Sequence, residues 1–99
     1  MPYLMAICRY SQDLSAAVME AFTNTHVDYP DFVKKVIDLF PMAHDDYENW
    51  VLFEISGESF MDAAGFVSKR YNNVAAAVKG FKFKLIPMAS DSEAMKLMQ

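Results

Sequence analysis

The sequence predicts an α+β protein whose elements follow the order strand, helix, strand, strand, helix, strand. Two observations carry this prediction. Apolar side chains recur every three or four residues from Phe60 to Val78, which is the spacing of one helical face. After Gly80, apolar side chains alternate with lysines from Phe81 to Leu85, and a period of two is typical of a strand with one buried face. At 99 residues we expect one domain, 1–99.

The composition narrows the class of protein. The chain is 54% hydrophobic and 14% aromatic, so it has enough apolar surface for a core and some to spare. A net charge of -4 without a large basic cluster disfavours nucleic acid as a partner. No apolar run approaches the about 20 residues of a membrane helix, and the short run Leu4–Cys8 lacks the charged leader of a signal peptide. The only cysteine, Cys8, excludes an intrachain disulfide, so we expect a soluble cytoplasmic protein.

The first third of the chain contains one strand and one helix. Residues 3–10 are apolar on both faces, which favours a central strand. Ser11 and Asp13 are candidate caps for an amphipathic helix that continues from Leu14 to about Asn24. Residues 23–30 have turn composition and no periodicity, so we expect a loop there.

The stretch from Phe32 to His44 fits two structures. Its apolar residues match a helical stripe and also a strand alternation. Pro41 breaks a helix interior but is tolerated in an edge strand. We therefore predict an edge strand over Asp38–His44 and leave 32–37 open between a helical turn and a strand. Residues 45–49 are predicted as a polar turn, and 50–56 as the next strand.

The last third begins with the long helix, which we expect to end at Gly80, where glycine can adopt the left-handed conformation. The strand Phe81–Met88 follows. Ser90 and Glu93 form a capping-box pattern ahead of Ala94, so the tail is predicted to be a short C-terminal helix.

This element order is the plan of a ferredoxin-like βαββαβ sandwich, a four-stranded antiparallel sheet with two helices on one face. The alternation predicts a face under the helices with Val51, Phe53, Ile55, Phe81, Phe83 and Leu85. The uncovered face is predicted to contain Tyr3, Met5, Ile7, Arg9, Trp50, Leu52, Glu54, Lys82, Lys84 and Ile86. That face is half apolar and half charged, which is typical of a subunit interface or of the floor of a cleft. We therefore expect the protein to associate with itself, as a homodimer.

Four segments resemble short uncharacterised bacterial and archaeal proteins of the dimeric α/β-barrel superfamily. They are the opening strand at Pro2, the segment 30–35, the strand 51–55 and the closing segment 78–87. The resemblance implies two ferredoxin-like subunits whose sheets pack face to face. The superfamily includes cofactor-independent and haem-using monooxygenases, lactone isomerases and aldoxime dehydratases, besides members without known activity. None of their catalytic residues matches a position here, so the resemblance implies no site residue and leaves the cofactor unknown.

His44 and Glu54 are the candidate catalytic residues. His44 precedes two aspartates and is either a solvated strand-end residue or a general base oriented by Asp46 or Glu48. His26 is the only other histidine, and spacing alone does not indicate a metal site.

Glu54 lies in the middle of a predicted central strand. It is either paired with Arg9, Lys82 or Lys84, or a ligand-orienting carboxylate.

The aromatic residues on the uncovered face are the last candidates. Tyr3 and Trp50 are either interface anchors or a platform for a flat ligand. They do not form the motif of the RNA-recognition module, and the CxxC loop of copper chaperones is absent. Cys8 is predicted to be a core residue.

Two functions remain open. One is a homo-oligomeric structural or small-ligand-binding module. The other is a monooxygenase or isomerase that acts on a small hydrophobic substrate between sheet and helices, with His44, Glu54, Arg9 and Trp50 in the pocket.

Overall fold

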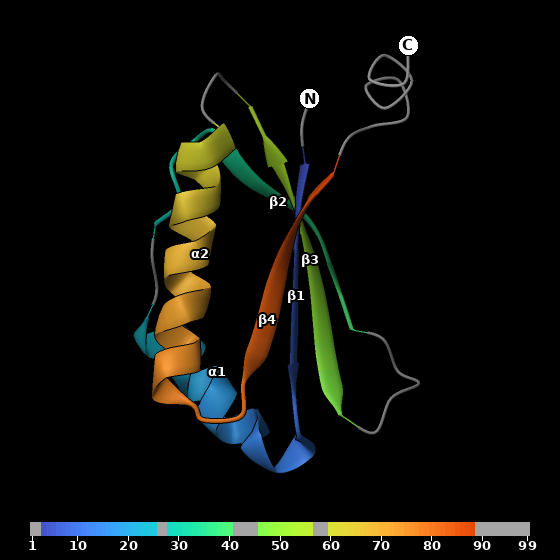
Figure 1. The fold of residues 1–99 in the computed structure, drawn as a ribbon, viewed down its shortest axis with the longest axis vertical. Helices are drawn as coiled ribbons and strands as arrows, with labels where there is room; N and C mark the ends of the chain where they lie inside the picture. The colour runs from blue at the N-terminus through green and yellow to red at the C-terminus, as the bar shows by residue number, and fades with distance from the viewer. Residues whose placement is uncertain (1–2, 26–27, 41–45, 57–59, 89–99) are drawn as a thin grey trace.

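The computed structural model of the protein describes residues 3–25, 28–40, 46–56 and 60–88. Over these residues, the strands form one antiparallel sheet in the order β2-β3-β1-β4, and both helices lie on one face of it (Figure 1). The fold is therefore α+β, as predicted, and compatible with the ferredoxin-like plan. Its elements are β1 (Tyr3–Tyr10), a 3-10 turn (Gln12–Leu14), α1 (Ser15–Asn24), β2 (Val33–Leu39), β3 (Tyr47–Ile55), α2 (Phe60–Ala77) and β4 (Lys82–Met88).

The second strand differs from its prediction. β2 begins at Val33, so 33–37 are strand, and a turn closed by a hydrogen bond from Val33 N to Pro30 O (2.9 Å) precedes it. The backbone of this segment pairs with β3 from Val33 to Leu39, and a ladder of hydrogen bonds outweighs a helical spacing of apolar residues. β2 is an edge strand, as expected, but it ends at Leu39, and the predicted continuation to His44 lies outside the described residues from position 41 onward.

The third strand also starts earlier than predicted. Tyr47, Glu48 and Asn49 belong to β3 rather than to a polar turn, because their backbone continues the ladder with β1 as far as the pair of Tyr47 with Tyr10. Strand pairing uses main-chain groups, so polar side chains at the end of a sheet do not end the strand.

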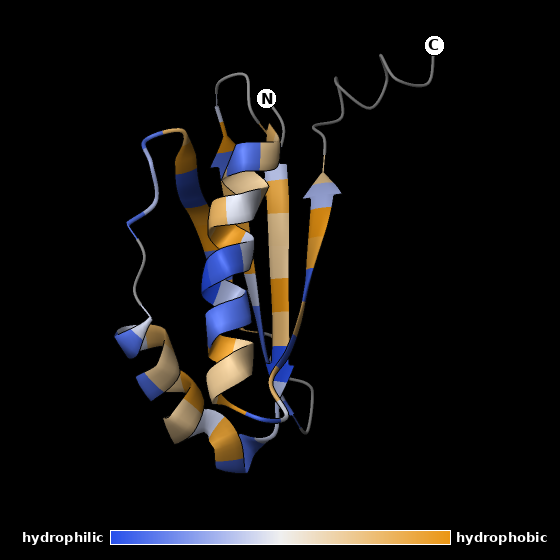
Figure 2. Ribbon diagram, turned by 60° about the vertical axis from the view of Figure 1, so that its left-hand side comes forward, coloured by the Kyte–Doolittle hydropathy of each residue, from blue (hydrophilic) through white to orange (hydrophobic). Residues whose placement is uncertain are grey.

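The core lies between the sheet and the helices. β1 and β3 contribute alternate residues to it, and α2 contributes residues at helical spacing. In Figure 2, both helices carry hydrophobic and hydrophilic bands, as expected of helices with one buried face. The buried residues of these elements include Leu4, Ala6, Cys8, Val18, Val51, Phe53, Ile55, Ala63, Val67, Tyr71 and Val74. The predicted assignment of β3 and β4 side chains to the helix face is confirmed, with Phe83 and Leu85 partly buried against this core.

The connection between α2 and β4 is a tight turn at Gly80. This glycine has φ 101°, the left-handed conformation predicted for it. Hydrogen bonds from Val78 N to Val74 O (2.9 Å) and from Phe81 N to Val78 O (3.2 Å) close the helix end. The turn lets Phe81 enter the core immediately after the helix. The predicted C-terminal helix, residues 90–98, lies outside the described residues.

Candidate functional site

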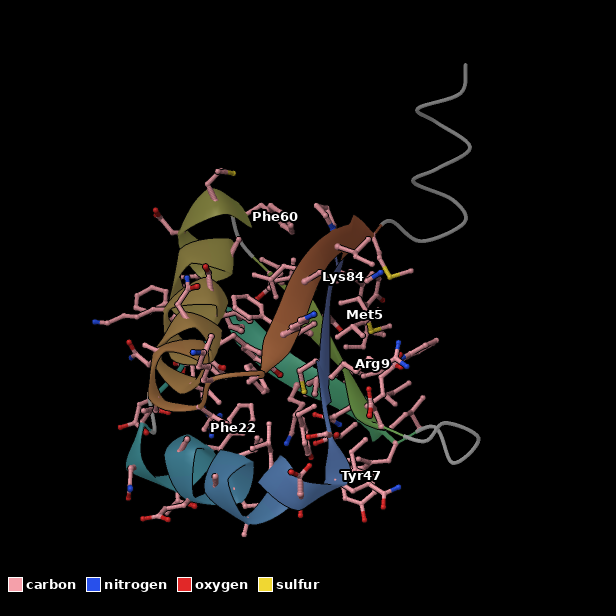
Figure 3. The ribbon with its side chains drawn as sticks, turned by 60° about the horizontal axis from the view of Figure 1, so that its bottom comes forward. Met5, Arg9, Phe22, Tyr47, Phe60 and Lys84 are labelled. Carbon is pink, nitrogen blue, oxygen red and sulfur yellow. The ribbon has the colours of Figure 1, made fainter. Side chains whose placement is uncertain are left out.

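The face of the sheet away from the helices, here called the open face, consists of four rows of cross-strand neighbours. The central rows are largely apolar, and the outer rows contain most of the charges. Figure 3 shows Met5 and Arg9 on the side of the sheet opposite α2. From β2 to β4 the rows are Lys34, Glu54, Tyr3 and Met88; Ile37, Leu52, Met5 and Ile86; Leu39, Trp50, Ile7 and Lys84; then Glu48, Arg9 and Lys82.

Several large apolar side chains on this face are in contact with solvent. Leu39 is 53% exposed, Ile37 44% and Trp50 37%. The Trp50 indole donates a hydrogen bond from Nε1 to Glu48 Oε1 at 2.5 Å, so its ring is held against its own strand. An apolar band of this extent, bordered by charges, is typical of an interaction surface. The predicted position of Tyr3, Trp50, Lys82 and Lys84 on the uncovered face agrees with this register, while their roles stay predictions.

The prediction that Glu54 pairs with Arg9, Lys82 or Lys84 on a neighbouring strand of the same chain is wrong. The antiparallel register places Glu54 opposite Tyr3 and Lys34, three rows from Arg9, and β4 with its lysines is separated from β3 by β1. Arg9 instead approaches Asp46, with 3.4 Å between Nε and Oδ2. Both side chains of that pair are substantially exposed, so it adds at most about 1 kcal/mol to stability.

A pocket lies on the other side of the sheet, between α1, α2 and strands β1, β2 and β3. Its volume is about 450 Å³, within the range of small-molecule sites. Its walls are mainly apolar and aromatic, and it is open to solvent on one side. The lining comprises Cys8, Tyr10, Val18, Met19, Phe22, Asp28, Tyr29, Lys35, Asp38, Phe40, Asn49, Val51, Phe53, Arg70 and Tyr71. Arg9, Trp50 and Glu54 are not part of this lining, and His44 lies outside the described residues.

A bulge in β2 places two charged residues at the edge of the pocket. Lys35 pairs with Phe53 and Asp38 with Val51, both on the helix face, because the register shifts between Lys35 and Ile37. Lys35 Nζ lies 3.3 Å from Asp38 Oδ2. On the other side, Asn49 Nδ2 donates to Asp38 Oδ1 at 2.5 Å and to the Leu39 carbonyl at 3.2 Å. The carboxylate of Asp38 is therefore held from two directions.

Arg70 and Tyr29 contribute the buried polar atoms of the pocket. Arg70 Nη2 donates to the carbonyl of Phe22 at 3.3 Å, and its guanidinium lies 5.2 Å from the centroid of the Phe22 ring. Figure 3 shows Phe22 between α1 and α2. Arg70 Nε and the Tyr29 hydroxyl are shielded from solvent, and neither has a hydrogen-bond partner within the described part of the chain. An unsatisfied buried polar group costs about 1–3 kcal/mol, so a ligand or water that satisfies both is favoured.

Burial also changes the acidity of groups around the pocket. It raises the pKa of Tyr29, and the neighbouring Arg70 guanidinium partly offsets the rise, although no hydrogen bond joins the two groups. Burial raises the pKa of Tyr71 as well, and that of the Cys8 thiol to about 11. Cys8 is therefore a protonated, unreactive residue of the pocket floor, in agreement with its predicted place in the core.

The sequence analysis expected a pocket between sheet and helices but did not identify the residues that line this one. Arg70 belongs to the polar side of a long amphipathic helix, and Tyr29 to a loop without periodicity, so neither stands out in the sequence. Among the residues that the structure describes, no group of three or more His, Cys, Asp or Glu side chains is arranged to hold a metal ion. In the same residues, no helix is long and apolar enough to cross a membrane.

No protein-family model matches the chain, and no curated protein matches it significantly. Among solved structures, the de novo designed protein Foldit4 is similar, with a TM-score of 0.61 at 6% sequence identity over 91% of this chain and 99% of that chain. A formyltetrahydrofolate deformylase from Pseudomonas putida KT2440 has a TM-score of 0.45 at 14% identity, and the match covers 87% of this chain and 28% of the deformylase. The resemblance to dimeric α/β barrels stays a prediction. The similarity to Foldit4 shows the α+β fold of this chain, and the fold alone.

Proposed function

We propose that this protein is a homodimeric, ferredoxin-like module that binds a small, mainly apolar ligand in the pocket between its helices and its sheet. The observation that carries the proposal is the pocket of about 450 Å³ with its aromatic walls. A ligand there would contact the rings of Phe22, Phe53 and Tyr71. Pockets of this size and composition bury most of the surface of a small ligand.

The binding function is tested with N-phenyl-1-naphthylamine, a neutral dye whose fluorescence rises in apolar sites. Met19 lines the pocket on α1 and is 62% exposed, so the larger side chain of Met19→Trp would occupy space at the pocket wall without disturbing the core. Met61 on α2 is 78% exposed and does not line the pocket, so Met61→Trp is the matched control. We expect Met19→Trp to weaken dye binding at least tenfold and the control to change it less than twofold. Absence of dye binding, or equal binding by both variants, would contradict the proposal.

Dimerisation is proposed through the open face, with a second copy of the chain as the occupant. The apolar residues of its two central rows would be removed from water by a facing sheet. The charges support a second copy as partner: Arg9, Lys82 and Lys84 lie on the β1–β4 half, while Glu48 and Glu54 lie on β3, with Lys34 beside Glu54 on β2. A two-fold axis parallel to the strands would place the basic half of each subunit against the half of its partner that contains the two glutamates. This arrangement matches the face-to-face sheets of dimeric α/β barrels.

The oligomeric state is tested by light scattering, since one chain has a mass of 11.3 kDa. Leu52 is in the middle of an apolar row of the open face, and Leu52→Asp would bury two carboxylates in a symmetric dimer. We expect about twice the chain mass for the wild type and for the control Met61→Asp, and a monomer for Leu52→Asp. A wild-type mass equal to one chain at micromolar concentration refutes the dimer while leaving ligand binding untouched.

A further inference from the structure

We infer that the ligand of the pocket carries one carboxylate on a flat apolar body, and that Arg70 and Tyr29 bind this carboxylate. The inference rests on the proposed ligand-binding function and adds the chemical class of the ligand. It follows from what Arg70 already contacts, from the charges of the other pocket residues and from the shape of the walls.

The guanidinium of Arg70 is held in place by the protein, but one of its N–H donors has no acceptor among the described residues. One of its nitrogens, Nη2, donates to the Phe22 carbonyl, and its Cζ atom lies over the Phe22 ring, 5.2 Å from the ring centroid. These contacts hold the group at the pocket wall, and its Nε–H has no acceptor in the described chain. A guanidinium has several N–H donors in one plane, and a carboxylate has the geometry to accept two of them together. Since the anchor is already formed, little side-chain freedom is lost when such a ligand binds.

Tyr29 supplies a second donor close to the first. Its hydroxyl is also shielded from solvent and without a partner among the described residues. Tyr29 and Arg70 both line this pocket, and the guanidinium of Arg70 lowers the pKa of the Tyr29 hydroxyl while burial raises it. An oxyanion between them would accept from Arg70 Nε and from the Tyr29 hydroxyl, and would satisfy both buried groups at once.

The remaining charges of the pocket are already engaged. Lys35 and Asp38 pair with each other, and Asn49 holds the second oxygen of Asp38. Asp28 has an interaction partner of its own. Arg70 is therefore the pocket cation that is left to neutralise an incoming anion, and a ligand with one negative charge matches it.

The aromatic walls of the pocket favour a ligand in which this anionic group is attached to a flat apolar ring system. Tyr29 meets Phe53 edge-on at 5.5 Å between ring centroids, and Phe22 meets Tyr71 in the same way at 5.5 Å. These two aromatic pairs lie beside the two unpaired donors, so a ring system between them would place its substituent at Arg70 and Tyr29. An aryl or polyunsaturated carboxylic acid has both the carboxylate and the flat apolar body.

The probes are 2-naphthoate and its neutral counterpart 2-naphthamide, which share the same ring system. The protein has two arginines, Arg70 in the pocket and Arg9 on the open face, so a ¹⁵N spectrum of the arginine Nε–H groups contains one site signal and one internal reference. We expect naphthoate to shift the Arg70 signal and not the Arg9 signal. We also expect naphthoate to bind at least tenfold more tightly than naphthamide by calorimetry.

Variants assign the preference to individual groups. Arg70→Met should reduce naphthoate affinity to that of naphthamide, and Tyr29→Phe should weaken naphthoate binding three- to tenfold. Lys69→Met is the matched control, because Lys69 is the exposed neighbouring cation on α2 and does not line the pocket. It should leave both affinities unchanged. The Arg70 signal of the wild-type protein keeps the test decisive if a variant fails to fold.

Different results would contradict the carboxylate assignment and the underlying ligand-binding function. Equal binding of naphthoate and naphthamide, with shifts at pocket residues but none at Arg70 Nε, overturns the carboxylate assignment and leaves the ligand-binding function standing. Absence of pocket shifts with both probes, together with absence of dye binding, overturns the function itself.

Discussion

The ammonium group of Lys35 lies 3.3 Å from a carboxylate oxygen of Asp38, although three positions separate the two residues along one strand. In a regular strand, residues i and i+3 point to opposite faces. Here Val36 is the extra residue of a bulge, so Lys35 and Asp38 both reach the helix face while Ile37 and Leu39 reach the open face. One inserted residue thus supplies polar groups to the pocket and apolar groups to the opposite surface.

The first prediction concerns Asn49 and Lys35, which hold Asp38 from two sides. Asn49 donates to Asp38 and to the carbonyl of Leu39, which ties β2 to β3. We expect Asn49→Ala to lower the free energy of unfolding by about 1–2 kcal/mol. Lys35→Met removes only an exposed ion pair and should cost less than about 1 kcal/mol. Urea denaturation compares the two variants, and a larger loss for Lys35→Met would contradict this ranking.

The second prediction compares two glycines. Gly80 has a positive φ, and a Cβ atom there would lie 3.0 Å from Leu14 Cδ1. Gly80→Ala should therefore lower the free energy of unfolding by about 1–2 kcal/mol. Gly65 lies in the middle of α2, where a Cβ atom would meet nothing within 4 Å. Gly65→Ala should raise the free energy of unfolding by about 0.5–1 kcal/mol, because alanine is the better helix former. Thermal and urea unfolding of the two variants show whether each change lowers or raises the free energy of unfolding.

The third prediction follows from the acidity of Cys8. Burial raises the pKa of its thiol from the ordinary 9.0 to about 11. Between these two values the unfolded chain releases the thiol proton while the native protein keeps it, so stability is lost as the pH rises through this window. The contribution lost is about 2–3 kcal/mol at most. Buried Tyr71 acts in the same direction from its ordinary pKa upward, because its pKa is raised too.

Replacing Cys8 separates the contribution of its thiol to this pH dependence from the contribution of Tyr71. Cys8→Ala should flatten the fall in the free energy of unfolding between pH 8 and pH 10.5, whatever its effect on stability at neutral pH. A thiol reagent such as DTNB should also react with the native protein at pH 8 at the rate of global or local opening, and rapidly only in urea. Immediate labelling of the native thiol would contradict its burial.

The fourth prediction uses Trp50, the only tryptophan of the chain, as a reporter of the proposed dimer. Its indole lies on the open face with 37% of the residue exposed in the single chain. A facing subunit would exclude water from it, so dilution through the dissociation constant should shift its emission to longer wavelength and increase quenching by acrylamide. In Leu52→Asp the emission should be independent of concentration. Concentration-independent emission of the wild type would count against the dimer.

The sequence by itself determined the order of the elements and the two faces of β1, β3 and β4. A period of two in Val51–Ile55 and Phe81–Leu85, a helical period in α2 and the stop at Gly80 are local signals, and each one follows from neighbouring residues. The structure agrees with all of them. The face of β1 with Tyr3, Met5, Ile7 and Arg9 was predicted in the same way.

Only the tertiary structure decided which residues share a site. The bulge at Val36 and the early start of β3 depend on pairing between strands, and no local period reports such pairing. The partners of Glu54 depend on the antiparallel register, and residues assigned to the same face turned out to be three rows apart. Arg70 on α2 and Tyr29 in the loop before β2 line the same pocket, although 41 positions separate them in the sequence. Periodicity describes one element at a time, whereas a pocket is formed where several elements converge.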